Sequence, residues 1–284
     1  MVHSKSVRSF GLSMVLVACT AVLCLAAVGL EPTHSAHSAA QAKSAIASSR
    51  MRARLSPGTQ EALEGSFRRE RNGWIYVHLE GTPDRIGYQH GYLLAPEIKE
   101  ALRVFEEYLP HTTKHDWSFY RKAAHSLFWD KIGDEYRQEI KGIAKGASER
   151  GVLGSRQVEA DDILALNAWI ELAQYYVPSI EALAGPDVHR VPPPSCSAFI
   201  ATGRYTRDGN VVIGHNNWID YLIGRHWNIV MDLKPASGHR ILMDSFPGFI
   251  HSGDDFYITD AGLMVTETTI TQFKGFKQDG LPEF

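Results

Sequence analysis

At Cys196 the spacing of apolar residues changes period, and this change limits the chain to a mixed fold. Before Cys196, the spacing predicts a strand over 73–79 and helices over 83–109, 117–149 and 160–177. After it, short apolar runs alternate with turns such as Asp208-Gly209. These runs predict six strands: Ser197–Arg204, Val211–Trp218, Trp227–Leu233, Arg240–Phe246, Phe256–Thr259 and Leu263–Thr269. We therefore expect an α+β protein in which a helical segment precedes an antiparallel sheet that starts at Cys196.

Local signals place two boundaries within the helical part. Thr82 is a preferred N-cap, Pro83 suits the first helical position, and Asp84 suits the first turn, so a helix should begin there. Residues 180–195 contain four prolines and a glycine, which predicts a loop immediately before Cys196.

The N-terminus has the layout of an export signal. Lys5 and Arg8 precede an apolar run over 10–30, and small residues follow. We predict that residues 1–36 are a signal peptide; an uncleaved anchor is the alternative, because about 20 apolar residues can also span a bilayer. Either reading predicts a secreted or periplasmic protein, tethered to a membrane in the second case. The Ala/Ser-rich stretch that follows predicts a linker over 37–72.

The charge balance argues against a polyanionic partner. The formal net charge is −3 and the basic residues are scattered, so we expect no nucleic-acid binding. Of the three cysteines, Cys19 and Cys24 lie in the apolar leader. A mature, exported chain would therefore keep Cys196 alone, which is either a small buried apolar residue or a reactive thiol.

Cys196 opens a strand directly after Pro192-Pro193-Pro194-Ser195. If the bond before it were cut, its own α-amine, with a pKa of about 7.7–8.0, could act as base for a thiol of pKa about 8.5. Before cutting, the thiol can attack the Ser195 carbonyl and form a thioester that water hydrolyses. This is the chemistry of an N-terminal nucleophile, and it predicts that the segment 73–195 is released or nicked on maturation.

A family resemblance supports this chemistry. Two segments, CSAFIATGRYTRDGNVVIGHNNW and DSFPGFIHSGDDFYITDAGLMVTETTI, resemble the phospholipase B-like family of N-terminal-nucleophile hydrolases, which is related to penicillin V acylase and 6-aminopenicillanate acyltransferase. Upstream, GTPDRIGYQHGYLLAPEI resembles the G-x-x-x-G-x-Q-x-G segment of these relatives. The resemblance implies an αββα sandwich and autocatalytic cleavage before Cys196. The residues after Cys196 suffice for one sheet but are few for two layers, so we expect 196–284 to be the start of an incomplete nucleophile domain.

The resemblance also assigns roles to individual residues. Cys196 becomes the nucleophile, and His215 and Asn216 match the second-strand motif that faces it. The acyltransferase relatives carry Arg-Asn there, so His215 departs from them and agrees with the phospholipase B-like pattern. His215 could polarise the thiol and Asn216 could donate to an oxyanion, whereas the alternative for His215 is a structural histidine of the sheet.

Further residues are expected to bind substrate. Trp218 is predicted as pocket wall or core, and Thr266, Glu267 and Thr268 lie where relatives place polar residues near the nucleophile. Glu267 could equally face solvent. Asp254-Asp255 could suggest a metal site, but adjacent carboxylates point to opposite sides of a strand, so we expect a turn or the start of a helix there instead. No histidine spacing matches a metal motif, so we expect no catalytic metal and no cofactor.

The leading hypothesis is an exported, self-cleaving acyl hydrolase whose substrate is a small acyl compound, either a lipid ester or an N-acyl amide. Contact with a membrane surface stays open. The alternative is a non-catalytic secreted or membrane-tethered binding protein that keeps the fold. A papain-like protease is set aside because its cysteine would open a helix.

Overall fold

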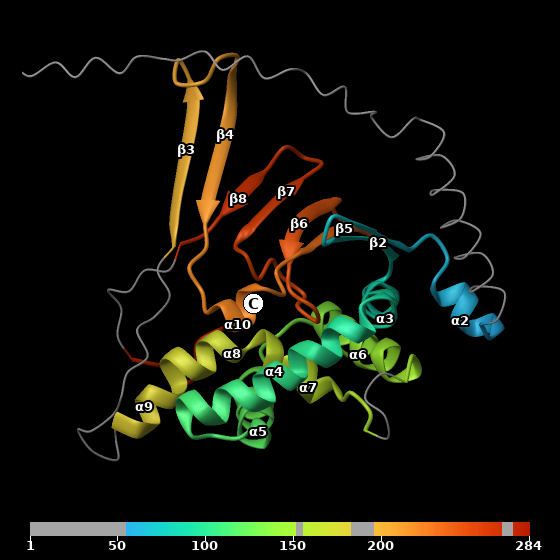
Figure 1. Ribbon diagram of the computed structural model, residues 1–284, viewed down its shortest axis with the longest axis vertical. Helices are drawn as coiled ribbons and strands as arrows, with labels where there is room; N and C mark the ends of the chain where they lie inside the picture. The colour runs from blue at the N-terminus through green and yellow to red at the C-terminus, as the bar shows by residue number, and fades with distance from the viewer. Residues whose placement is uncertain (1–54, 152–155, 183–195, 269–274) are drawn as a thin grey trace, which may run out of the picture. The chain divides into compact units, whose positions relative to one another are not determined.

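The computed structural model describes residues 55–151, 156–182, 196–268 and 275–284, and it combines helices with a mixed sheet (Figure 1). Its helices are α2 (Pro57–Ala62), α3 (Pro83–Leu93), α4 (Ala95–Thr113), α5 (Trp117–Phe128), α6 (Asp134–Glu149), α7 (Ala160–Asn167), α8 (Trp169–Glu171), the π-helix η1 (Leu172–Tyr176), α9 (Val177–Ala182) and α10 (Tyr221–Gly224). Its strands are β1 (Phe67–Arg71), β2 (Trp74–Gly81), β3 (Ser197–Gly203), β4 (Gly209–Asn216), β5 (Ile229–Pro235), β6 (Ile241–Ser245), β7 (Phe256–Thr259) and β8 (Met264–Thr266). The α+β class is confirmed.

The strands form two sheets. One has six strands in the order β1-β2-β5-β6-β7-β8, and the other is the two-stranded ribbon β3-β4. Among the described strands, β2 and β5 alone run parallel, with Ile75 opposite Ile229. The prediction of a sheet that begins at Cys196 is therefore wrong for the larger sheet, which includes β1 and β2. A parallel pair joins segments far apart in the chain, so no local pattern announces it.

The predicted linker 37–72 needs a correction at its end. Helix α2 and strand β1 lie within it, and β1 pairs with β2 across Asn72-Gly73. Both turn residues have positive φ (53° and 83°), as a two-residue hairpin turn with the twist of the strands requires. Residues Arg68 to Arg71 are all charged, so the sequence shows no apolar alternation that would predict this strand. The predicted leader, with the rest of the linker, lies outside the described residues.

The helix predictions hold in outline. A helix does begin at Pro83, although the Thr82 side chain makes no capping hydrogen bond. The predicted helix 83–109 is divided at Leu94 into α3 and α4. The range 117–149 is divided into α5 and α6, with Gly133 as the N-cap of the second. Residues 160–177 form α7, α8 and the π-helix, and α9 continues into the predicted loop as far as Ala182.

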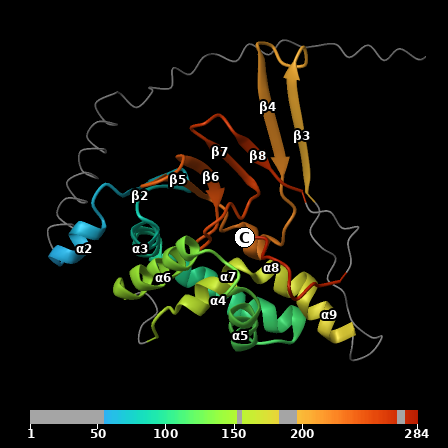
Figure 2. The same cartoon turned by 180° about the vertical axis from the view of Figure 1, so that it is seen from behind.

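The core lies between the six-stranded sheet and the helices, which lie along one side of it in both views (Figures 1 and 2). Ile75, Val77 and Leu79 of β2 point into this core, as their alternation predicts, and Met231 of β5 joins them. On the opposite face Asp232 accepts hydrogen bonds from Tyr76, His78 and Arg240. Burial would raise the pKa of Asp232, but these donors hold it well below its ordinary value.

Helices α3 and α6 pack through glycines that face the other helix. A Cβ on Gly91 would lie 2.0 Å from the carbonyl oxygen of Ile143, and one on Gly146 would lie 2.2 Å from that of Tyr88. Gln89 lies between Gly87 and Gly91 of α3. It is buried, and its side chain accepts a hydrogen bond from the amide of Glu80 (2.8 Å). The glycines and glutamine of the predicted motif therefore pack the helix pair and attach it to β2.

Two buried polar side chains attach the segment after β6 to the helices. Asn167 donates to the carbonyl of Gly248 (3.0 Å) and accepts from the amide of Ile250 (2.9 Å). His90 Nε2 accepts from the amide of Gly248 (3.0 Å), and complete burial lowers the pKa of His90 to about 3. These contacts hold the chain in place immediately before the turn that carries Asp254 and Asp255.

Within the described ranges, we find no helix that combines the length and the apolar character needed to cross a bilayer.

Candidate active site

Cys196 lies directly before β3, with its side chain half-buried. In the ribbon, Ala198 lies opposite His215 and Ser197 lies opposite Asn216. Side chains alternate along a strand, and residues directly opposite share a face. Cys196 and His215 therefore lie on one face of the ribbon, diagonally adjacent, and Asn216 lies on the other face.

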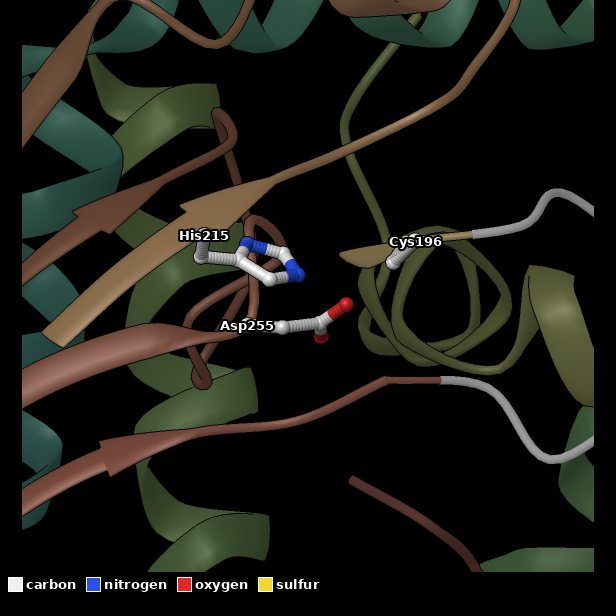
Figure 3. A group of neighbouring side chains, drawn as sticks. All are labelled: Cys196, His215 and Asp255. Carbon is white, nitrogen blue, oxygen red and sulfur yellow. The ribbon is translucent and has the colours of Figure 1, made fainter. Parts of the chain in front are cut away.

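His215 points its ring toward Cys196 (Figure 3). The ring nitrogen farther from the backbone is directed into the space between the cysteine and Asp255. This atom, Nε2, is buried and has no hydrogen-bond partner among the described residues. A buried imidazole nitrogen without a partner is costly in a folded protein, so this position has a polar group available for a ligand or for chemistry.

Asp255 is the third member of the group, and it comes from the turn before β7. Its backbone has a φ of 56°, which aspartate adopts more readily than most residues. Ser252 holds this turn, because its carbonyl accepts from the amide of Asp255 (3.0 Å) and its hydroxyl accepts from that of Phe256 (2.9 Å). As a result, Cys196, His215 and Asp255 each contribute one polar atom to a group in which all three atoms lie within 4.8 Å of one another.

The surroundings of Asp255 favour its neutral form. Burial, and then the charge and hydrogen bond of Glu267, raise the pKa of Asp255 to about 8; Glu283 and Asp254 act in the same direction. At neutral pH this carboxyl group is therefore mostly protonated. A carboxyl group with this pKa can donate or accept a proton near physiological pH.

A second carboxyl pair lies beside this turn. Burial and the hydrogen bond with Asp254 raise the pKa of Asp244, in β6, to about 8. Two carboxyl groups that share a hydrogen bond cannot both ionise cheaply, so one proton is retained by the pair.

This pair predicts a pH-dependent stability. The folded protein keeps the Asp244 proton up to about pH 8, whereas an unfolded chain loses it near pH 4, so the free energy of unfolding should fall as pH rises between these values. Asp244→Asn removes the titration. In urea titrations, the free energy of unfolding of Asp244→Asn relative to wild type should therefore increase from pH 4 to pH 8. The expected increase is about 1.4 kcal/mol or more, which corresponds to a pKa shift of one unit. Asp260→Asn, in the exposed turn between β7 and β8, is the control. Parallel pH profiles of Asp244→Asn and wild type would contradict the assignment.

The Cys196 thiol is not activated in the uncut chain. Burial raises its pKa, the backbone N–H of Trp218 lowers it, and the charges of Asp255, Glu267 and Asp254 raise it again. The thiol also donates a hydrogen bond to Asn217 Oδ1 (3.6 Å). A base is therefore needed before this sulfur can attack a carbonyl group.

The two asparagines after His215 have different positions. Asn216 donates to the Ser197 hydroxyl (3.4 Å) on the face opposite the thiol. Asn217 lies beyond the end of β4, on the thiol face, and contacts Cys196 directly. The predicted partner of the nucleophile was Asn216, and the structure brings its neighbour to the sulfur.

The predicted substrate-binding residues are divided between the site and its edge. Trp218 is 66% exposed, and its backbone N–H acts on the Cys196 sulfur. Glu267 is exposed, yet it contacts Asp255 through its side chain and donates its amide to the Asp255 carbonyl (3.2 Å). Thr266 Oγ1 is buried with no hydrogen-bond partner in the described part of the chain, and Thr268 is half-buried. Ser195, the predicted cleavage residue, lies outside the described residues.

Sequence reasoning did not assign Asp255 and Asn217 to the site. The alternation of strand residues could have indicated Asn217, since it lies two positions after His215. Asp255 gave no such signal, because only the pairing of β7 with β6 brings its turn to the ribbon.

Comparison with known proteins shows which family the chain resembles. The profile of a family described as Phospholipase B matches residues 75–276. The chain is 28% identical to an uncharacterized protein of Archaeoglobus fulgidus over 207 residues, which are 68% of this chain and 32% of that protein. It is 28% identical to phospholipase B-like 1 of Homo sapiens over 197 residues, 66% of this chain and 34% of that protein. Putative phospholipase B-like 2 of Bos taurus is 35% identical over 86 residues, 27% of this chain and 14% of that protein.

The chain thus spans about a third of the length of the first two relatives. The family match includes β2, the ribbon and the turn that carries Asp255, and therefore all three side chains of the group. It covers well over half of the sequence. The chain belongs to the phospholipase B family.

Proposed function

We propose that this chain carries the nucleophile of an exported acyl hydrolase that cleaves an ester or amide bond in the manner of a phospholipase B. The observation that carries the proposal is the convergence of Cys196, His215 and Asp255 within 4.8 Å in a member of this family. A thiol, an imidazole and a protonated carboxyl group supply a nucleophile, a base and an acid.

Maturation would come first. With His215 as the available base, the Cys196 sulfur attacks the carbonyl carbon of Ser195, and the peptide nitrogen leaves as a protonated amine. Water then hydrolyses the thioester, which restores the thiol and leaves Cys196 with a free α-amine. The position of Cys196 directly before a strand supports this step, because the new terminus stays attached to the ribbon.

Turnover would use the new terminus. The α-amine accepts the thiol proton, and the thiolate attacks the carbonyl carbon of the substrate. The resulting oxyanion needs a donor, and the Asn217 side chain can provide one once its amide turns its NH₂ group toward the site. The leaving alkoxide or amine takes a proton, which the α-ammonium group can return from the thiol or which protonated Asp255 can donate. Hydrolysis of the acyl thioester by water releases the acid and regenerates the thiol.

The proposed architecture is the αββα sandwich of N-terminal-nucleophile hydrolases. The exposed faces of the ribbon support it: Phe199 and Ile200, which point to opposite sides, are 60% and 64% exposed. Apolar strand faces of this kind normally pack against another layer. The N-terminal apolar run supports export.

A thiol-directed acyl analogue tests the proposed function. We expect one label per chain, on Cys196, located by peptide mass spectrometry. Asn217→Ala should slow labelling by about tenfold or more if its amide stabilises the oxyanion, whereas Asn216→Ala, on the other face, should change the rate by less than about twofold.

The second candidate is a non-catalytic binding protein, and the raised pKa of Cys196 in the uncut chain favours it. Labelling distinguishes the two. An unmodified Cys196 in the folded, purified and chelator-treated protein would reject the hydrolase and leave the binding protein.

A further inference from the structure

The group at the candidate site combines three different donor types from three separate segments. Cys196 precedes β3, His215 lies in β4, and Asp255 lies in the turn before β7. Their ligand atoms lie within 4.8 Å of one another. Around a tetrahedral zinc ion, with bonds of about 2.0–2.3 Å, such atoms would be about 3.5 Å apart. A small side-chain adjustment would therefore bring all three onto one ion.

The unpartnered His215 nitrogen is a second, independent observation that points to a ligand. Nε2 is buried and points into the space shared with Cys196 and Asp255 (Figure 3). With its ring proton on Nδ1, an imidazole in this position directs the Nε2 lone pair at the place where an ion would lie. Hydrogen bonding among the described residues does not satisfy it.

The charge around the group also suits a cation. Glu267, Asp254 and Glu283 all act on Asp255, where their negative charges repel a further one. A divalent cation would remove this repulsion. Glu267 and Asp254 also act on Cys196, so a thiolate at this position is better tolerated beside a bound cation.

We propose that Cys196, His215 and Asp255 form a Zn²⁺ site, with a fourth position for water, and that bound Zn²⁺ holds the sulfur in an unreactive state. Thiolate and imidazole ligands favour Zn²⁺ over Mg²⁺ and Ca²⁺, which prefer oxygen. A sulfur lone pair engaged with the metal cannot attack a carbonyl carbon. The binding stands on the geometry alone, whereas the block of acylation rests on the proposed function. The ligands come from three segments, so no contiguous sequence motif could have announced this site.

Calorimetric titration of the purified, chelator-treated protein with Zn²⁺ tests the binding. We expect one ion per chain, no comparable binding of Mg²⁺, and a loss of affinity of about tenfold or more in both Cys196→Ser and Asp255→Asn. Both substitutions keep the shape of the side chain, and asparagine tolerates the positive φ at 255. Titration with Co²⁺ should give a sulfur-to-metal charge-transfer band that Cys196→Ser abolishes.

Asp254→Asn is the matched control, because Asp254 is the adjacent carboxylate but is not one of the three ligands. Its affinity for Zn²⁺ should stay within about threefold of wild type. An equal loss in Asp254→Asn and Asp255→Asn would show that a diffuse acidic cluster attracts the ion, and it would overturn the site. So would the absence of Zn²⁺ binding.

Acyl labelling separates this proposal from the proposed function. Saturating Zn²⁺ should slow the labelling of Cys196 by about tenfold or more, and a chelator should restore the rate. Undiminished labelling with Zn²⁺ bound would overturn the block. If Zn²⁺ binds but Cys196 is not labelled even without metal, the metal site stands and the hydrolase fails.

Discussion

Cys196→Ala is expected to abolish both chain cleavage and acyl hydrolysis, the largest effect that we predict for this protein. Alanine has no nucleophile to attack the Ser195 carbonyl, so the bond before residue 196 should stay intact. The acyl-enzyme cannot form either, and the rate should fall by about 10⁴-fold or more, to what the surrounding site alone provides. Intact mass and N-terminal sequencing should show a new terminus at Cys196 in the wild type and one uncut chain in the variant.

Two further variants separate chemistry from folding. Cys196→Ser keeps a nucleophilic atom and should cleave slowly, because the hydroxyl is harder to ionise than the thiol. Asn216→Ala, on the far face of the ribbon, should cleave at nearly the wild-type rate. A wild-type protein that stays uncut under all conditions, with the same mass pattern as Cys196→Ala, would disprove autocatalytic maturation.

Gly91→Ala is expected to destabilise the fold by about 3 kcal/mol, because its Cβ would lie 2.0 Å from the carbonyl oxygen of Ile143 and 2.9 Å from the amide of Ala147. These are backbone atoms, and no side chain can turn away to make room. Helices α3 and α6 would have to separate, which would open the core between α6 and α7 and loosen the attachment of α3 to β2. Gly87→Ala should act similarly, since its Cβ would meet the carbonyl oxygen of Glu139 at 2.1 Å.

Gly58→Ala in α2 is the matched control. This glycine is also helical, but in the described part of the chain no atom outside its own helix backbone and chain neighbours lies within 4 Å of an added Cβ. Alanine is the better helix former by about 1 kcal/mol, so this variant should be equal to or more stable than wild type. Urea unfolding followed by circular dichroism measures both. A Gly91→Ala protein as stable as Gly58→Ala would show that α3 and α6 do not pack this closely.

Local signals predicted most element boundaries in the second half of the chain. The alternation after Cys196 gave strands that match β3 to β7 within two residues, because glycine and asparagine turns end each one. The same reasoning failed for β1, where four consecutive charged residues leave no apolar alternation, and for the parallel pairing of β2 with β5. Pairing of distant segments depends on how the helices cover the sheet.

At the candidate site, too, the sequence indicated some residues and only the fold indicated others. Cys196 and His215 were named from the sequence, and the register of β3 and β4 places them on one face. Their catalytic roles stay predictions. For Asp254-Asp255 the sequence predicts a turn or a helix start and argues against a metal site; Asp255 does lie in a turn, and that turn points its carboxylate toward the cysteine (Figure 3).

The sequence by itself determined that Cys196 lies at the boundary between a mainly helical segment and a segment of strands, because the spacing of apolar residues and the turn residues are local properties. Only the tertiary structure decided which groups surround the sulfur. Strand register selected Asn217 rather than Asn216, and the turn before β7 brought Asp255 beside it. The physical reason is that side-chain chemistry at a site depends on distances across the sheet, which no spacing along the chain encodes.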